Sequence, residues 1–577
     1  MTTYQPMAFT FTPAERVRGQ SPYQPGARAP WVDLVLDANE GPALRPEQLA
    51  ELPAIDADAV RQYPSTASLE QTIAERFGIN SARVIVTNGG DDAIDRICRI
   101  ALEPGRTLVA HTPTFEMIIR SAKLAGACID RVAWTDGEFP LPEFVDRIKE
   151  STGLVSIVTP NNPTGRAVQT ESVIEVAAAA RRAGALVLVD LAYIEFADED
   201  PTTSLLELDN VLVVRTFSKA FGLAGLRVGY TIVPESIAPL IRVVGGPYPV
   251  SAPSLRIAEI MFRQADRPLE IASAVREQRA DLAAVLSRLG CIVSPSQANF
   301  ILARTPRAEF LWQGLRALGI SVRRFTAQTE LEDALRITLP GGQQEYDRLR
   351  QAIETTLAPE AILFDLDGVL ADVSTSYREA IIRTAADYGA TATPNVIQNI
   401  KDAGNANNDW LVTQRILANQ GITAPLEEIV ERFQQHYLGN AEQPGLRERE
   451  SLIPSPEFLR SLASRFKLAV VTGRPRSEAR WFLDRFGLTD LFGAVVCMED
   501  AVAKPSPEPV LRAMDQLGVS AAWMIGDTPD DIIAARTAAA LPVGITAPGQ
   551  ETSRQTLTAS GAARVLDTLE ELTEILP

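Results

Sequence analysis

Short apolar runs, each followed by polar or glycine-rich residues and then by a helical pattern, recur through the first part of the chain. Four of them cover residues 84–87, 155–159, 185–190 and 211–216, and all are rich in Val, Ile or Leu. Such runs are typical of strands buried on both faces, as in a parallel sheet between helices. Because ligands bind at the carboxyl ends of these strands, the polar residues that follow them are candidates for a site. The pattern predicts an α/β fold with a mainly parallel sheet.

The run at 211–216 leads into the most informative segment, which continues to residue 230. This segment places hydroxyls at Thr216 and Ser218, an amine at Lys219 and a guanidinium at Arg227. A lysine after a buried strand can bond to an aldehyde cofactor, while hydroxyls and an arginine can hold the phosphate of that cofactor. For a Ser-Lys pair alone, a surface lysine after a core strand is the commoner explanation. Pyridoxal phosphate is the cofactor that fits the whole segment best.

The string from Thr216 to Arg227 reads Thr-Phe-Ser-Lys-Ala-Phe-Gly-Leu-Ala-Gly-Leu-Arg. It resembles the lysine signature of the fold-type I aminotransferases, and most closely that of the histidinol-phosphate aminotransferases. The resemblance implies a large, mainly parallel α/β domain and a small α/β domain, together expected over residues 1–358. We expect an irregular arm at residues 1–40 and a small domain completed by residues from about 285 to 358. A homodimer is also implied.

The resemblance implies further cofactor contacts. A glycine turn after the run at 84–87 starts a predicted helix, and backbone N–H groups at Gly90 and Asp91 would lie on the cofactor phosphate. Phe115 matches the aromatic residue that stacks on the pyridine ring, although core packing is a competing explanation. Tyr63 matches a tyrosine that reaches the cofactor phosphate of the partner subunit.

The pyridine ring needs partners at its nitrogen and at its phenolate oxygen. Asp190 ends the run at 185–190, where a carboxylate is costly without a partner. A protonated pyridine nitrogen would be that partner, and its protonation makes the ring an electron sink. By the resemblance, Asn162 and Tyr193 would bond the phenolate oxygen.

Four residues are candidate substrate contacts by the same resemblance. Tyr23 lies in a Pro-Tyr-x-Pro-Gly segment, and Asn39 lies in an Asn-Glu pair. Arg336 matches the arginine that grips the donor carboxylate, and Arg323 matches the one that holds the substrate phosphate; either alone would more often lie at the surface. After Arg336 the chain continues Ile-Thr-Leu-Pro-Gly-Gly, where relatives usually have Val-Gly or a similar pair after Arg-Ile-Thr.

A second buried run, residues 361–364, leads to Asp365 and Asp367 at alternate positions. Two carboxylates this close repel unless a cation or different protonation states separate their roles. A magnesium-dependent phosphohydrolase supplies both conditions. Asp365 would attack phosphorus, and Asp367 would protonate the leaving alcohol and then activate water. A turn is the competing explanation for Asp-x-Asp-Gly alone.

Three later motifs complete this interpretation: Thr472 ends a strand, Lys504 offers a cation, and Asp527 and Asp531 offer oxygen ligands for magnesium. In this order the four motifs resemble the haloacid dehalogenase superfamily. The resemblance implies that Mg²⁺ is held by Asp365, Asp367, Asp527 and Asp531. It implies that Thr472 and Lys504 contact the substrate.

The expected hydrolase covers residues 359–577, with a Rossmann-like core and a helical cap at about 372–454. Caps select substrates in this superfamily. The polar stretch at 405–410 lies in the cap and either touches the leaving group or joins two helices; we favour the second role.

The composition limits the kinds of molecule that the chain is expected to bind. The chain has 55 basic and 73 acidic residues, and its net charge of −18 argues against nonspecific binding to nucleic acid or anionic membranes. The four cysteines show no zinc or disulfide spacing, and the two histidines exclude histidine clusters. Residues 1–20 lack a signal-peptide pattern, and no apolar run is long enough to span a bilayer. We expect a cytoplasmic enzyme that acts on small molecules.

These resemblances together imply a bifunctional enzyme. The first half would transfer an amino group from glutamate to imidazole-acetol phosphate, giving histidinol phosphate, and the second would hydrolyse a phosphate monoester. Histidinol phosphate is the economical choice for that ester. One alternative is an aminotransferase or amino-acid phosphate decarboxylase of other metabolism, fused to a phosphatase with a different substrate. Another is a C-terminal domain that only binds or regulates.

Overall fold

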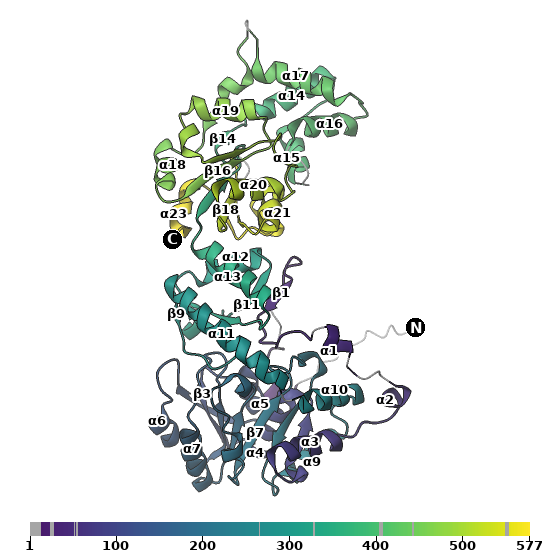
Figure 1. Ribbon diagram of the computed structural model, residues 1–577, viewed down its shortest axis with the longest axis vertical. Coiled ribbons are helices and arrows are strands. Elements are labelled where there is room, and N and C mark those ends of the chain that lie inside the picture. Colours follow the sequence, from purple (N-terminus) through teal and green to yellow (C-terminus); the bar gives the residue numbers. More distant parts are fainter. Residues whose placement is uncertain are drawn as a thin grey trace, which may run out of the picture.

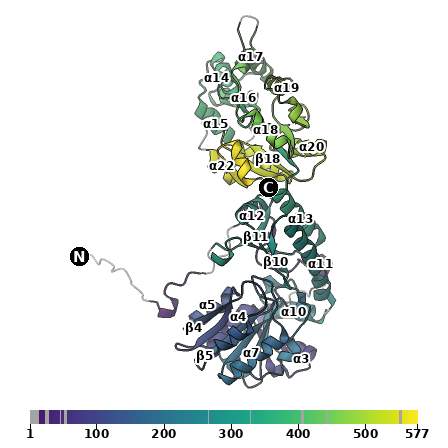
Figure 2. The same cartoon turned by 90° about the vertical axis from the view of Figure 1, so that its left-hand side faces the viewer.

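The structure is a computed structural model that describes residues 13–22, 28–44, 46–50, 52, 56–264, 266–326, 329–402, 408–440, 443–548 and 553–577. Tyr23 and residues 405–407 therefore lie outside the described residues. Figures 1 and 2 show an elongated molecule in which a small domain lies between a large α/β domain and the C-terminal lobe.

The large domain is built on a seven-stranded sheet in the order β2-β8-β7-β6-β5-β3-β4. β8 runs antiparallel to both of its neighbours, while the other strands pair in parallel. The prediction of a mainly parallel sheet is thus confirmed. The strands are β2 (Val84–Thr87), β3 (Thr107–Thr112), β4 (Cys128–Ala133), β5 (Thr152–Val158), β6 (Leu186–Asp190), β7 (Val211–Thr216) and β8 (Gly229–Ile232).

Helices cover both faces of this sheet, and each face has its own apolar cluster. Alternate residues of β2 supply the two clusters, since Val84 and Val86 belong to one and Ile85 to the other. The helices on one face are α3 (Ala67–Phe77), α7 (Thr170–Arg182) and α10 (Ala252–Arg263); those on the other are α4 (Gly89–Ala101), α5 (Glu116–Leu124) and α9 (Ala238–Val243). The sheet therefore lies between two helical layers, with its carboxyl edge left open.

The small domain has a five-stranded sheet in the order β1-β11-β12-β10-β9. The elements are β1 (Leu34–Leu36), β9 (Ile292–Val293), β10 (Phe300–Arg304), β11 (Ile320–Arg324), β12 (Ala334–Thr338), α11 (Asp266–Arg288), α12 (Ala308–Ala317) and α13 (Gln343–Leu357). The expectation of a wholly irregular arm is wrong for β1, which pairs in parallel with β11. The partner strand lies far along the chain, so the local sequence of the arm gives no sign of it.

The C-terminal lobe has a six-stranded parallel sheet in the order β17-β16-β13-β18-β19-β20. Its strands are β13 (Ala361–Phe364), β16 (Lys467–Val471), β17 (Ala494–Val496), β18 (Ala522–Gly526), β19 (Leu541–Ile545) and β20 (Arg564–Leu566). Its helices include α18 (Pro456–Ala463), α19 (Arg476–Arg485), α20 (Glu508–Leu517), α21 (Pro529–Thr537) and α22 (Ser553–Ser560). Together with the large domain, this sheet confirms the α/β fold class.

A helical insertion lies on this lobe, at the end far from the small domain (Figure 1). The chain enters it through β14 (Ala371–Asp372) and leaves through β15 (Ser451–Leu452), and these two strands pair antiparallel. The helices between them are α14 (Tyr377–Asp387), α15 (Pro394–Asp402), α16 (Asp409–Asn419) and α17 (Leu426–Leu438). We call this insertion the cap. The side chain of Asn408 accepts hydrogen bonds from the backbone of Trp410 and Leu411, so it caps α16.

Among the residues that the structure describes, no helix is both long and apolar enough to cross a membrane.

Candidate active sites

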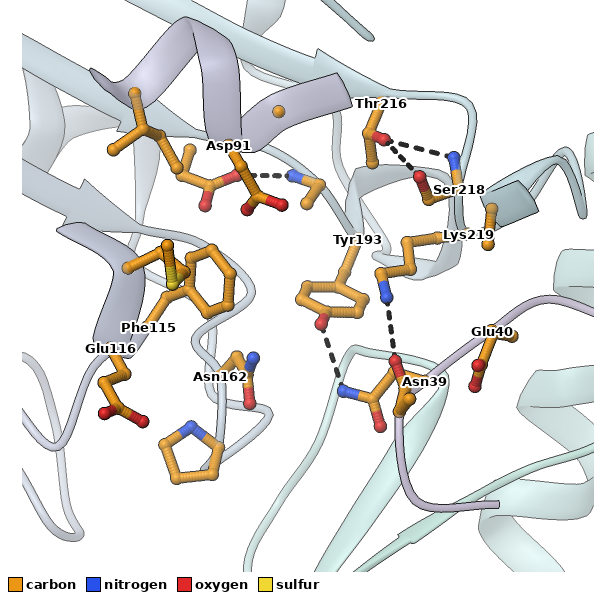
Figure 3. A pocket seen from close by; sticks show the side chains of 18 of the residues that line it. Asn39, Glu40, Asp91, Phe115, Glu116, Asn162, Tyr193, Thr216, Ser218 and Lys219 are labelled. Carbon is orange, nitrogen blue, oxygen red and sulfur yellow. Dashed lines mark hydrogen bonds between the residues drawn. The ribbon is translucent and has the colours of Figure 1, made fainter. Parts of the chain in front are cut away.

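The carboxyl edge of the large sheet opens onto a cavity of about 620 Å³, part of which is drawn in Figure 3. Both the large and the small domain supply its wall. The cavity brings together these predicted residues: Asn39, Gly90, Asp91, Phe115, Asn162, Asp190, Tyr193, Thr216, Ser218, Lys219, Arg227, Arg323 and Arg336. The cavity also contains Glu40, the second residue of the Asn-Glu pair, and Glu116, for which the sequence suggested no role.

Lys219 places an amine inside the cavity, where its Nζ donates a hydrogen bond to the carbonyl oxygen of Ala38 at 3.0 Å (Figure 3). Burial, with a smaller contribution from Arg336, lowers the pKa of Lys219 to about 8. The arm packs directly on this segment, because a Cβ at Gly41 would lie 1.8 Å from the carbonyl oxygen of Lys219. A lysine with a lowered pKa is a better nucleophile near neutral pH, since more of it is unprotonated.

Asp190 ends β6 with a carboxyl group that is only 4% exposed. Its Oδ1 accepts a hydrogen bond from the backbone N–H of Ala192 at 3.0 Å. Burial raises the pKa of Asp190 to about 7. No basic side chain in the described part of the chain forms an ion pair with it. A cationic ring nitrogen entering the cavity would supply the missing charge, so the site fits a protonated pyridine.

The end of β7 and the start of α4 bring hydroxyls, a guanidinium and a helix N-terminus to one corner of the cavity. Thr216 Oγ1 donates to Ser218 Oγ at 2.9 Å, and both side chains are buried. The guanidinium of Arg227 lies 3.2 Å from Asp91 in the first turn of α4. A Cβ at Gly89 would lie 2.7 Å from that guanidinium, so glycine permits the close approach. Hydroxyls, a guanidinium and a helix N-terminus together suit a phosphate group.

Tyr193 and Asn39 are joined by a hydrogen bond that Asn39 Nδ2 donates to the phenol oxygen at 3.0 Å (Figure 3). Thr338 donates in turn to Asn39 Oδ1 at 2.9 Å. Asn39 adopts a φ of 58°, a left-handed conformation that asparagine tolerates better than most residues. This chain of bonds ties the arm to the small domain and fixes the phenol in the cavity wall.

Two arginines of the small domain face the same cavity. Arg323 on β11 lies directly opposite Arg336 on β12, so both side chains emerge on one face of the sheet. Arg336 donates to Asn162 Oδ1 at 2.6 Å and to the carbonyl oxygen of Asp37 at 2.7 Å. Like charges at opposed positions destabilise a sheet unless anions offset them. The pair is therefore suited to acidic ligands.

Asp37 was missed by the sequence reasoning. It forms an ion pair with Arg28 at 2.7 Å, and Arg28, Ser321 and Arg323 hold the pKa of its carboxyl below the usual value although burial opposes them. Nothing in the local sequence distinguishes this aspartate.

Tyr63 lies away from the cavity. It is 80% exposed and stacks on Tyr248, with ring centroids 4.4 Å apart. The structure therefore does not bring it together with the other predicted cofactor residues of its own subunit.

The carboxyl edge of the second sheet holds a cluster of acids. Asp365 follows β13, Asp527 follows β18, and Asp531 lies in the first turn of α21; their carboxylate oxygens lie within 4.8 Å of one another. Lys504 Nζ lies 3.0 Å from Asp365 Oδ1 and 2.5 Å from Asp531 Oδ1. One ammonium cannot balance three carboxylates, and an all-oxygen set of this kind suits Mg²⁺. The residues present therefore fit the metal.

Burial dominates the electrostatics of this cluster. It raises the pKa of Asp365 to about 7 although Lys504 opposes the shift, and it raises that of Asp527 well above its usual range. A cation bound among these oxygens would favour their charged forms.

Two local devices hold the acids in place. Asp531 Oδ2 accepts hydrogen bonds from Thr528 N at 3.1 Å and Thr528 Oγ1 at 2.6 Å, which completes a capping box on α21. Gly368 has a φ of +74°, and a Cβ there would lie 2.3 Å from Asp527 Oδ2. The glycine after Asp367 thus permits the loop after β13 to lie close to Asp527 in the loop after β18.

Thr472 is buried at the end of β16, and its Oγ1 accepts a hydrogen bond from the backbone of Arg474 at 3.2 Å. Among the described residues Asp367 is not part of that acid cluster, and its Oδ1 lies 2.6 Å from the guanidinium of Arg474. Sequence reasoning gave Arg474 no role, although it stands directly after Thr472-Gly.

Comparisons with known proteins find one matching family for the first part of the chain and another for the second part. A family model described as aminotransferase class I and II matches residues 34–353, and one described as haloacid dehalogenase-like hydrolase matches residues 359–539. The histidinol-phosphate aminotransferase of Thermoanaerobacter sp. is 34% identical over 311 residues, which cover 53% of this chain and 88% of that protein.

Two further proteins are similar. An imidazoleglycerol-phosphate dehydratase of Phytophthora nicotianae is 46% identical over 197 residues. The match covers 33% of this chain and only 44% of the length of that relative. The crystal structure of histidinol-phosphate aminotransferase from Sinorhizobium meliloti, in complex with pyridoxal 5'-phosphate, has a TM-score of 0.50 and 24% identity. It covers 56% of this chain and 91% of that one, and the likeness shows the fold.

Proposed function

This chain belongs to the family of class I and II aminotransferases and carries a haloacid dehalogenase-like hydrolase domain after it, and from this we propose a bifunctional enzyme of histidine biosynthesis. Its first active site transfers an amino group between glutamate and imidazole-acetol phosphate. Its second hydrolyses a phosphate monoester, and histidinol phosphate, the product of the first site, is the proposed substrate. The observation that carries the first activity is one cavity that contains Lys219, Asp190 and the opposed pair Arg323 and Arg336.

Pyridoxal phosphate, once bound, supplies an electron sink that weakens the Cα–H bond of the amino substrate. Asp190 would keep its ring nitrogen protonated, and Asn162 and Tyr193 would bond its phenolate oxygen. Thr216, Ser218, Arg227 and the start of α4 at Gly90 and Asp91 would hold its phosphate, while Phe115 would stack on its ring. Lys219 Nζ would move the proton from the substrate Cα to the cofactor in one half of the cycle, and from the cofactor to the substrate carbon in the other half.

The substrates would be held by the small domain. Arg336 would bind the carboxylate of glutamate, and Arg323 would bind the phosphate of the alternative substrate. Asn39 lies beside Tyr193 in the same wall and would contact the substrate from the arm. A cavity with two adjacent guanidiniums can accept a dicarboxylate and a phosphate ester in turn, because each brings an anion to the same place.

The hydrolase site would work through two carboxylates. Asp365 attacks phosphorus, the P–O bond to the alcohol breaks, and Asp367 gives its proton to the departing oxygen. Asp367 then takes a proton from a water molecule that attacks the aspartyl phosphate, which releases phosphate and restores Asp365. Thr472 and Lys504 would bind the phosphoryl oxygens. Mg²⁺ would be held by Asp365, Asp527, Asp531 and the backbone carbonyl of Asp367.

We propose the aminotransferase over residues 1–358 and the phosphohydrolase over residues 359–577. We also propose that the enzyme is a cytoplasmic homodimer formed through its N-terminal half. Tyr63 supports the dimer, because an 80% exposed tyrosine stacked on Tyr248 is free to face another subunit. Tyr23 would contact substrate from the arm, although it lies outside the described residues.

The decisive experiment is incubation of the purified protein with histidinol phosphate and MgCl₂, followed by measurement of phosphate. A parallel reaction adds pyridoxal phosphate and 2-oxoglutarate and measures glutamate. We expect both products. Release of carbon dioxide, or formation of an unrelated keto acid from a different amino donor only, would overturn the proposed transamination. Absence of phosphate would overturn the proposed hydrolysis and favour a binding or regulatory module.

A further inference from the structure

Arg474 is the most deeply buried arginine near either site, with a side chain that is only 1% exposed. It lies in the loop after β16, and its guanidinium contacts two carboxylates from different parts of the chain. Nε lies 2.6 Å from Asp367 Oδ1 on one side, and NH1 lies 3.0 Å from Glu450 Oε2 on the other. The guanidinium therefore bridges the hydrolase core and the residue directly before β15, where the chain leaves the cap.

The contact with Asp367 restricts how that carboxyl can turn. Both Nε and NH2 of Arg474 lie 2.6 Å from the same oxygen, Oδ1. In the described part of the chain, Oδ2 has no hydrogen-bond partner among the protein groups, and the side chain is 23% exposed. Because Oδ1 is held, Oδ2 is the oxygen that remains available to a leaving group. A general acid must lie within hydrogen-bonding reach of the oxygen that it protonates, so this orientation matters.

Glu450 stands directly before β15, where the chain leaves the cap. Its side chain is fully buried and accepts hydrogen bonds from Ser376 at 2.9 Å and Tyr437 at 3.0 Å, both of which lie in the cap. β15 pairs with β14, and Asp367 bridges to Ala371 at the start of β14. Asp367, Arg474 and Glu450 thus meet where the cap joins the core.

The aromatic surroundings keep the guanidinium in one place. It lies over the ring of Tyr377 at 4.6 Å and over that of Phe482 at 5.6 Å, one from the cap and one from the core. A planar guanidinium whose faces lie against two rings and whose edges each contact a carboxylate has few alternative rotamers, and lysine cannot reproduce this geometry.

We propose that Arg474 is a positioning residue that orients the carboxyl group of Asp367 for proton transfer, and that Glu450 at the cap junction holds Arg474 in place. This inference rests on the proposed phosphatase function. It makes the placement of the acid depend on the junction between cap and core, because Glu450 stands directly before the strand through which the chain leaves the cap. Arg474 itself does not touch the reacting atoms.

The test compares two esters in single-turnover reactions and follows release of the alcohol, which reports the first step alone. Histidinol phosphate has an alkoxide leaving group that needs a proton, whereas 4-nitrophenyl phosphate has one that does not. We expect Arg474→Lys to slow alcohol release from histidinol phosphate by about 10- to 100-fold, and release of 4-nitrophenol by less than about 3-fold. Glu450→Gln should show the same preference with a smaller effect, and the substrate dependence of the single-turnover rate should change little in either variant.

Glu478→Gln is the matched control. Glu478 is a buried glutamate beside the same junction, bonded to Tyr377 and Gln434 but not to Arg474. Its substitution should change the two rates equally if at all. Hydrogen exchange gives a readout independent of turnover, because Glu450→Gln should speed exchange of the paired amides of β14 and β15 while Glu478→Gln should not.

Thermal unfolding shows which variants are folded. If Arg474→Lys does not fold, because Glu450 becomes an incompletely paired buried charge, Glu450→Gln tests the same idea alone. Equal slowing of both esters in the folded variants would overturn the inference while leaving the phosphatase intact. A wild-type protein that releases no alcohol from histidinol phosphate would overturn the proposed function, and the inference with it.

Discussion

Replacement of Asp190 by Asn should stabilise the cofactor-free protein at alkaline pH while it impairs amino transfer. Asp190 is 4% exposed, and the one hydrogen bond that its carboxylate makes among the described residues, from Ala192 N to Oδ1, can be kept by the amide oxygen of Asn. The substitution thus removes a buried negative charge and little else. In the active enzyme, that charge is needed to keep the ring nitrogen of the cofactor protonated.

The size of the effect follows from the pKa of Asp190, which burial raises from 3.8 to about 7. The folded protein binds this proton more tightly than the unfolded chain does, so stability is lost as the pH rises from about 4 to about 7 and is constant above that range. Integration of the linkage relation gives a penalty of about 1.7 kcal/mol at pH 5 and about 4.3 kcal/mol at pH 8. Asn carries no charge at either pH. The free energy of unfolding of Asp190→Asn relative to wild type should therefore be about 2.6 kcal/mol higher at pH 8 than at pH 5.

Urea unfolding of the cofactor-free wild-type and Asp190→Asn proteins at pH 5 and pH 8 measures this difference. Asp146→Asn serves as the control, because it removes the same charge from a side chain that is 82% exposed to solvent. Amino transfer by Asp190→Asn, assayed with added pyridoxal phosphate, should fall by about 10²-fold or more. An advantage of Asn that is the same at both pH values would refute the argument from buried charge.

Three further predictions concern the proposed chemistry. Lys219→Ala should abolish amino transfer and the absorbance of the bound cofactor while phosphate release continues; near-normal amino transfer would contradict the role of the lysine. The protein should sediment as a dimer through its N-terminal half, with an interface on the order of 2,000 Å² or more, and a fully active monomer would disprove this. Asp365→Asn should abolish phosphate release, whereas Asp367→Asn should slow alcohol release from histidinol phosphate by about 10²- to 10⁴-fold and from 4-nitrophenyl phosphate less. Equal slowing of the two esters by Asp367→Asn, or substantial turnover by Asp365→Asn, would show that these roles are misassigned.

Much of the fold could be predicted because it depends on local sequence. Apolar runs mark β2, β6, β7 and β13, and α3 ends at Gly78, a glycine with a φ of 65°. β1 could not be predicted, because three residues of the arm become a strand only through pairing with β11. The antiparallel direction of β8 could not be predicted either, because it depends on how the loop through Arg227 brings the chain back alongside β7.

The residues of the two sites also divide into those that the sequence reveals and those that it does not. Lys219, Asp190 and Asp365 stand at the ends of apolar runs, where a polar residue is conspicuous in the sequence. Glu450 shows no such signal, because it follows other charged residues in the sequence. Its role depends on its contacts with Arg474 and Ser376, which lie elsewhere in the chain. Contacts between residues distant in sequence are set by tertiary packing, and a single sequence carries little trace of them.

The two catalytic halves are joined by more than the short link at residues 358–360. Trp523 of β18 is fully buried against the small domain, where its Nε1 donates to the carbonyl oxygen of Thr355 at 2.7 Å and its ring lies 5.4 Å from that of Phe310. α12 approaches closely through Gly314, since a Cβ there would lie 2.4 Å from Thr356 and 3.2 Å from Leu541. One apolar cluster runs through both regions.

Separating these surfaces would expose large aromatic side chains and leave the indole N–H without its partner, at a cost of several kcal/mol. The small domain and the hydrolase core should therefore move as one body. Arg323 and Arg336 lie on that body, whereas Lys219 and Asp190 lie on the large domain. Any closure of the small domain over the aminotransferase cavity must consequently carry the hydrolase lobe with it, which makes the link between the two active sites mechanical even where no substrate passes between them.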